Sequence, residues 1–198
     1  MRRGGTGSCQ RSFYVCQLRE ALEIASVRWH QRRLATTESA GHAAVMEVED
    51  EYLVQRAVEG LLDDLDDDAA FQSLTPEQQA ASPAWVPAGL VSNGGFEAWV
   101  ESLGQRTLEA VAGLRLMGAD GYAGLLEQLA RLYPTLGAAD ADTRLSAMDA
   151  WGDREVGQLH QLTQQFFELQ QAHDLEEQFV APFVRAYPRQ FPLRVEDL

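Results

Sequence analysis

The sequence Asn-Gly-Gly-Phe-Glu-Ala-Trp-Val at residues 93–100 marks the start of a helix in the middle of the chain. Its two adjacent glycines permit a positive φ or a close approach of another backbone. Asn93 can cap the helix that follows, and Phe96 and Trp99 would then bury against neighbouring elements. We favour this structural interpretation over an anion site at a helix N-terminus, because Glu97 would lie in the first turn and repel an anion.

The sequence on the C-terminal side of this stretch has helical spacing. A helix over about 106–117 is predicted to end at Gly118, and Asp120 can cap the next helix, which Pro134 stops. The remaining predicted segments are a loop over 135–143 and helices over 143–150, 153–171 and 174–187. Pro182 can kink the last of these helices.

The sequence on the N-terminal side also predicts helices. Residues 75–78 read Thr-Pro-Glu-Gln, which supplies a capping threonine, a proline in the first turn and a glutamine that closes a capping box. Pro83 and Pro87 are expected to break the following segment into short pieces around Trp85. Residues 47–67 form one predicted helix with an apolar stripe of Val54, Val58, Leu61 and Leu65. Because strand alternation is absent, the predicted fold class is all-α, a compact multi-helix bundle.

The opposite face of the predicted 47–67 helix carries Glu51, Gln55, Glu59, Asp63 and Asp67, each four residues apart. Residues four apart on a helix are neighbours at about 5–6 Å, so this face could present a ladder of negative charge in place of DNA phosphates. A solvated helix face is the alternative interpretation. The candidate partner-binding carboxylates are Glu47, Glu51, Glu59, Asp63, Asp66 and Asp67.

The charge of the chain divides near residue 45. Residues 1–45 contain seven arginines and three acidic residues, whereas residues 46–198 contain nine arginines and 27 acidic residues, a net charge of −18. We predict a basic N-terminal extension over 1–45, loosely attached and with a helix over 11–34, and an acidic all-helical domain over 46–198. The extension could be a targeting peptide, a docking helix, or sequence upstream of a true start at residue 46. An acidic domain repels nucleic acid and anionic membranes and attracts basic protein surfaces.

The sequence predicts no catalytic, cofactor or metal site. Asp64, Asp66 and Asp68 have the first spacings of an EF-hand loop, but Ala69 replaces its glycine and Thr75 its bidentate glutamate. The histidines form no HExxH pair, no GxSxG nucleophile elbow occurs, and the chain contains no lysine. Enzyme activity is therefore not expected.

The expected location is the cytoplasm. Cys9 and Cys16, the only cysteines, both lie in the predicted extension, so the acidic domain has no disulfide framework. No apolar run approaches the roughly 18 residues that a membrane-spanning helix needs. A reducing cytoplasm fits both observations.

Residues 93–97 also begin a family resemblance. A short helix, the Asn-Gly-Gly-Phe string, an aromatic-rich helix and an ALxxIGA-like segment resemble the DNA-mimic-protein C-terminal domain family, with segments 108–119 and 122–129 in the family's order. The similarity covers about 50–180 and is strongest over 85–135. The motif residues, to which our interpretation gives a structural role, are Asn93, Gly94, Gly95, Phe96, Glu97, Trp99 and Gly118.

This resemblance implies a function as well as an all-α fold. By analogy with the characterised member of that family, the resemblance implies an acidic homodimer. Such a dimer imitates double-stranded DNA and occupies the DNA-binding surface of a transcription factor. The partner would be a basic DNA-binding protein, with no direct binding of nucleic acid or membrane. Ala98 departs from the family, which often has glutamine at that position. The alternative is a general protein-interaction or regulatory domain without mimicry, which duplex DNA need not displace from its partner.

Overall fold

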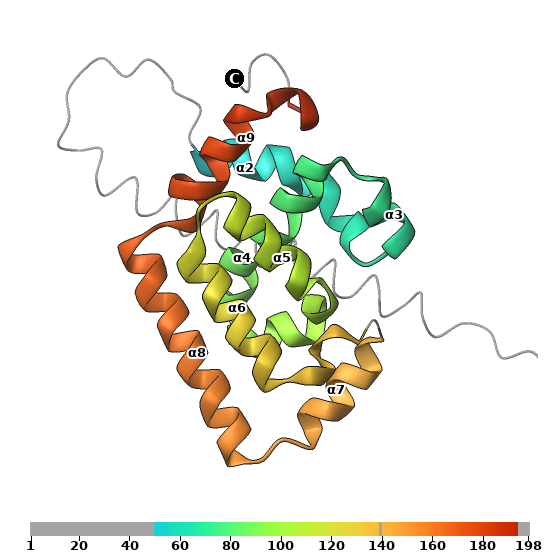
Figure 1. Ribbon diagram of the computed structural model, residues 1–198, viewed down its shortest axis with the longest axis vertical. Coiled ribbons are helices and arrows are strands. Elements are labelled where there is room, and N and C mark those ends of the chain that lie inside the picture. Colours follow the sequence, from blue (N-terminus) through green and yellow to red (C-terminus); the bar gives the residue numbers. More distant parts are fainter. Residues whose placement is uncertain (1–49, 139, 194–198) are drawn as a thin grey trace, which may run out of the picture. The chain divides into compact units, whose positions relative to one another are not determined.

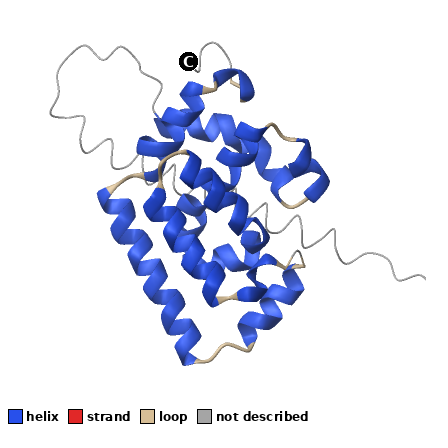
Figure 2. Ribbon diagram, in the orientation of Figure 1, coloured by secondary structure: helices blue, strands red, loops and turns tan. Residues whose placement is uncertain are grey.

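Helices and connecting loops build the whole of the chain that the computed structural model describes, residues 50–138 and 140–193 (Figure 2). The predicted all-α bundle is confirmed, since no strand occurs in these two ranges. The predicted extension over 1–45 lies outside the described residues. The α-helices are α2 (Asp50–Val58), α3 (Asp68–Ser73), α4 (Pro76–Leu103), α5 (Thr107–Leu116), α6 (Asp120–Leu132), α7 (Ala141–Asp149), α8 (Asp153–Ala172) and α9 (Ala181–Ala186). Tighter 3-10 turns are η2 (Glu59–Leu65), η3 (Gly104–Arg106), η4 (Pro134–Gly137) and η6 (Pro188–Gln190), and η5 (Glu176–Val180) is a π-helix.

Helix α4 is the central element, and α5, α7 and α8 pack against it (Figure 1). It begins with the predicted capping box, in which the Thr75 hydroxyl and the Gln78 side chain each accept a backbone N–H. The prediction that Pro83 and Pro87 break this segment is wrong, because α4 runs through both prolines. A proline inside a helix costs about 3 kcal/mol or more. Every residue from Ala80 to Val91 is buried, and this burial offsets the cost.

Helices α4 and α5 touch backbone to backbone at Gly113. A Cβ atom at this position would lie 2.1 Å from the carbonyl oxygen of Ala80. Only glycine permits this approach, because real Cβ atoms do not come so close to a carbonyl. Helix α6 then packs on the other side of α5 (Figure 1).

An aromatic cluster joins α4, α6 and α8. The ring of Phe166 meets Phe96 at a centroid distance of 5.9 Å and Tyr122 at 5.3 Å, both edge to face, an arrangement that aromatic pairs prefer. The Tyr122 hydroxyl lies 2.6 Å from Oε1 of Gln170. Burial raises the pKa of Tyr122. These contacts fix α8 alongside α4 and α6.

Several predicted boundaries were wrong. Residues 135–143 are not one loop, because η4 occupies their start and α7 begins at Ala141. Asp140 caps α7, and the hydroxyl of Thr143 donates to its carboxylate and lowers the pKa of Asp140. The predicted helix over 174–187 is a π-helix followed by α9, with Pro182 in the first turn of α9. Asp120 does not cap α6, since Ala119 occupies the cap position and Asp120 pairs with Arg115 at 3.2 Å.

We predict that Gly113→Ala destabilises the domain by about 1–3 kcal/mol, because the added methyl group forces α4 and α5 apart. Gly157→Ala is the matched control: Gly157 is an exposed position of α8, and its Cβ would meet nothing within 4 Å. The control should be unchanged or gain up to about 1 kcal/mol from better helix propensity. Urea unfolding curves measure both changes, and equal midpoints for the two variants would contradict the close packing.

Candidate functional site

Residues 59–68, here called the acidic segment, combine a buried and a charged side. Leu61, Leu62 and Leu65 point into the core and are at most 7% exposed. Asp63 and Asp67 are exposed, and Asp68 is 75% exposed. The carboxylates of this segment are Glu59, Asp63, Asp64, Asp66, Asp67 and Asp68. The three leucines therefore hold a segment rich in charged side chains against the bundle.

The prediction of one α-helix over 47–67 is wrong in its second half, which changes the geometry of the proposed ladder. Helix α2 ends at Val58, and Glu59–Leu65 continue as a 3-10 helix. A 3-10 helix has about three residues per turn. Side chains four residues apart therefore point in directions that differ by about a third of a turn around the helix axis. Glu59 and Asp63 thus do not continue one straight row, and Asp67 lies beyond η2. The candidate carboxylates occupy several short elements instead of one stripe.

The remaining candidates fall on either side of η2. Glu47 lies outside the described residues, and Glu51 belongs to α2. Asp66 follows η2 directly and is partly buried. Asp67 caps α3, and its carboxylate accepts the backbone N–H groups of Ala69 at 2.8 Å and Ala70 at 3.0 Å. Acid at a helix N-terminus is favourable, so the end of this aspartate run stabilises the start of α3.

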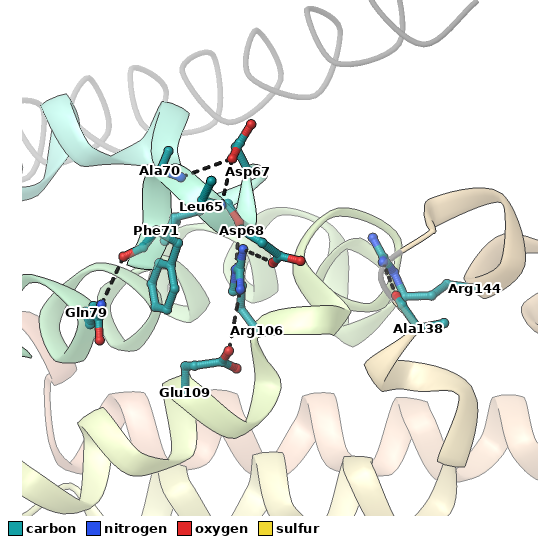
Figure 3. Close-up of polar contacts among 11 residues, drawn as sticks. Leu65, Asp67, Asp68, Ala70, Phe71, Gln79, Arg106, Glu109, Ala138 and Arg144 are labelled. Carbon is teal, nitrogen blue, oxygen red and sulfur yellow. Dashed lines mark hydrogen bonds and ion pairs between the residues drawn. The ribbon is translucent and has the colours of Figure 1, made fainter. Parts of the chain in front are cut away.

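Arg106 ties the acidic segment to α5, and sequence reasoning missed it. Its side chain is 4% exposed, and Nε donates to the carbonyl of Leu65 at 2.7 Å (Figure 3). Nη2 pairs with Asp68 at 2.7 Å, and Nη1 lies 3.5 Å from Glu109. The guanidinium also stacks on the ring of Phe71, 4.3 Å from its centroid, a favourable cation–π contact. The sequence held one indication of its importance: Arg106 is isolated, since no other basic residue occurs between residues 56 and 115.

Arg144 is a second buried arginine, and it binds the C-terminal end of α4. It is 2% exposed, and Nε donates to the carbonyl of Val100 at 2.8 Å while Nη2 donates to that of Glu101 at 3.0 Å. A third bond reaches the carbonyl of Ala138 (Figure 3). The last carbonyls of a helix have no partner within the helix. Arg144 therefore caps α4 from α7.

The Asn-Gly-Gly-Phe string forms a kink within α4, here called the glycine kink. Gly94 and Gly95 have non-helical backbones, and Gly95 has φ 67° and ψ −171°, a region that essentially only glycine occupies. The side-chain Nδ2 of Asn93 donates backwards to the carbonyl of Gly89 at 2.8 Å. The cap comes from α8, where the hydroxyl of Thr163 accepts the backbone N–H of Phe96 at 3.1 Å.

The other motif residues support this arrangement. Phe96 and Trp99 are fully buried, and the indole N–H of Trp99 donates to the hydroxyl of Thr107 at 3.0 Å. Glu97 lies in the first turn after the kink, 3.2 Å from Nε2 of His160. Gly118 has φ 79° just after the end of α5. These contacts pack the motif residues into the fold, and they place the carboxylate of Glu97 in the first turn after the kink.

Other kinds of site were sought in the same residues. No group of three or more metal-ligating side chains occurs within 50–138 and 140–193. None of the helices in these ranges is both long and apolar enough to cross a membrane.

The fold and the sequence define an acidic all-α domain in which one buried arginine, Arg106, holds the Leu65 carbonyl and the Asp68 carboxylate. Residues 72–187 match the DMP19-like protein family. Because this match covers more than half of the 198 residues, the chain belongs to that family, a family of DNA-mimic proteins. No curated protein and no solved structure matched the chain. The match includes the glycine kink, Arg106 and Arg144, whereas the whole acidic segment precedes it.

Gly95→Ala should destabilise the domain by about 1–3 kcal/mol, since alanine rarely adopts this backbone and its Cβ would lie 2.5 Å from Oε2 of Glu97 and 3.3 Å from the Thr163 hydroxyl. Gly118→Ala is the control for backbone strain alone, because a Cβ there meets nothing within 4 Å. We expect Gly95→Ala to cost at least about 1 kcal/mol more, as it also disturbs the Phe96 cap. Thermal and urea unfolding provide the comparison, and equal losses would show that Thr163 does not matter.

Arg106→Lys should lower the free energy of unfolding by about 1–3 kcal/mol, because a buried carbonyl loses its donor. Lysine keeps the positive charge but lacks the planar guanidinium group, which donates to Leu65 and Asp68 while it stacks on Phe71. Arg154→Lys, at an exposed position of α8, should change stability by less than about 0.5 kcal/mol. If both variants unfold at the wild-type urea midpoint, Arg106 does not anchor the acidic segment.

Proposed function

We propose that the acidic domain binds the basic, DNA-contacting surface of another protein, such as a transcription factor, and excludes DNA from that surface. Membership of a DNA-mimic family and the net charge of −18 over residues 46–198 support this proposal. Arginine and lysine side chains placed to bind phosphates can bind carboxylates instead, through charge-assisted hydrogen bonds. The partner is then a protein, and nucleic acid is its competitor.

The observation that carries the proposal is the anchoring of the acidic segment. Leu61, Leu62 and Leu65 are buried, and Arg106 holds both the Leu65 carbonyl and the Asp68 carboxylate. A charged segment that is already held in place loses less conformational entropy on binding. Its charges follow one another along ten residues, as phosphates follow one another along a duplex. We therefore infer that this segment, with Glu51 of α2, supplies the main charges of the interface.

A regulatory domain that binds its partner without imitating DNA is the other candidate. The two differ in one respect, since duplex DNA must displace a mimic and need not displace a general interaction domain. A homodimer, as the family resemblance implies, would double the acidic surface and fits either function. Cytoplasmic location and a role in transcription are parts of the same proposal.

The decisive variant replaces Glu51 and Glu59 with Gln and Asp63 and Asp67 with Asn. Asn caps a helix about as well as Asp, so α3 should remain. Asp63 and Asp67 are exposed, and loss of exposed charges costs little stability. The control variant removes the same number of charges from exposed positions of α7 and α8, at Asp142, Asp149, Asp153 and Glu168. Proteins captured from a lysate of the source organism by the wild-type chain serve as partners.

We expect the partner to bind the first variant at least about tenfold more weakly and the control variant nearly as well as wild type. Binding to the wild-type chain should weaken steeply with salt, and double-stranded DNA should compete for the same partner. Equal binding by the two variants would remove the acidic segment from the interface. Binding that DNA does not displace would favour the regulatory domain without mimicry.

A further inference from the structure

Helix α5 exposes an apolar face that the core does not use. Leu108 is 73% exposed and Leu116 is 64% exposed, and the exposed Ala112 lies between them at four-residue spacing. Residues four apart are neighbours on a helix surface, so the three form one stripe, here called the α5 stripe. The residues of α5 that pack against α4 and α6 are others, Ala110, Val111, Gly113 and Leu114.

The α5 stripe is continuous with the acidic segment. Glu109 follows Leu108 in the chain. On the helix surface it lies one turn before Ala112 and two turns before Leu116. Its carboxylate and that of Asp68 meet the same guanidinium, Arg106 (Figure 3). Arg106 therefore brings the start of α3 and the start of α5 together, with acid on one side of the stripe.

The other end of the α5 stripe is also acidic. Arg115 lies beside Leu116, but its guanidinium pairs with Glu127 at 2.8 Å and with Asp120 at 3.2 Å. The hydrogen bond with Glu127 raises the pKa of Arg115. Two carboxylates thus pair with Arg115, while Arg131 of α6 donates to the backbone carbonyl of Glu127. At the start of the stripe, two carboxylates pair with the single buried guanidinium of Arg106, so the rim there carries net negative charge.

We propose that the α5 stripe and its acidic rim bind a basic amphipathic helix of a partner protein, with leucine-like side chains on the stripe and arginines or lysines on the rim. This inference rests on the proposed function and specifies the chemistry of the partner. A second copy of this acidic chain would bring like charges together, which is unfavourable. Duplex DNA offers the partner no equivalent of Leu108 and Leu116, so the stripe would add affinity that DNA lacks.

The test uses two synthetic peptides of equal length and equal positive charge. One has leucine and arginine at helical spacing, and in the other alanine replaces each leucine, which preserves helix propensity. Titration calorimetry with the full chain should give about tenfold tighter binding for the leucine peptide. This preference should persist at high salt, which screens charges but not apolar contacts, and the heat capacity change should be more negative.

Leu108→Ser combined with Leu116→Ser should reduce the ratio of the affinities for the leucine and alanine peptides to about one. The salt-sensitive part of binding should remain. Leu132→Ser combined with Val156→Ser is the matched control, because both residues are 38% exposed and lie on α6 and α8. The control should keep the preference. Circular dichroism checks that both variants are folded.

The outcomes separate this inference from the proposed function. If wild type binds both peptides equally at low salt, the α5 stripe has no role and the acidic interface still stands. If it binds neither, the proposed function fails as well. If sedimentation shows a dimer that only the Leu108 and Leu116 substitutions dissociate, the stripe binds a second copy and the proposal is overturned.

Discussion

The burial of the middle of α4 constrains the elements around it. Every residue from Ala80 to Val91 is buried, so each neighbouring helix is placed by its fit to this one surface. The closest fit is with α5, where Gly113 lets two backbones meet. Interiors are close-packed, and a change in this contact would therefore be felt by α6 and α8, which pack beyond it. The position of the acidic segment depends on the same frame, because η2 rests on α4.

The distribution of charge follows from this frame. Within the described residues two arginines are buried, Arg106 and Arg144. Arg106 donates to the carbonyl of Leu65, and Arg144 donates to carbonyls at the end of α4. A buried charge is costly unless it is hydrogen-bonded and paired. In contrast, no acidic side chain from Glu59 to Glu177 is buried.

Local patterns predicted much of this fold. The capping box at Thr75, the helix before Gly118 and the helix over 153–171 agree with the structure within one or two residues, because each is decided by neighbouring residues. The misses involve tertiary contacts. Pro83 and Pro87 were expected to stop a helix, but the expectation ignored complete burial, which no local rule contains.

The candidate site shows the same division. The sequence predicted which carboxylates cluster, but not that the helix tightens at Glu59, so the ladder it predicted is not straight. Arg106 lies 38 residues from Asp68, and only the folded chain brings them together. Asn93 had the right chemistry for a cap, whereas the structure uses Thr163, 67 residues beyond Phe96. Non-local hydrogen bonds of this kind leave no periodic signal in a sequence.

The cap supplied by Thr163 also bears on the order in which the chain folds. Helices α4, α5 and α6 follow one another and pack against their neighbours, so short loop closures can bring them together early. The contact between Phe96 and Thr163 spans 67 residues, and its closure entropy is larger. The Asn-Gly-Gly-Phe string is therefore completed by a contact that closes a longer loop than the contacts joining α4, α5 and α6. Without α8, the backbone N–H of Phe96 lacks the Thr163 hydroxyl that accepts it.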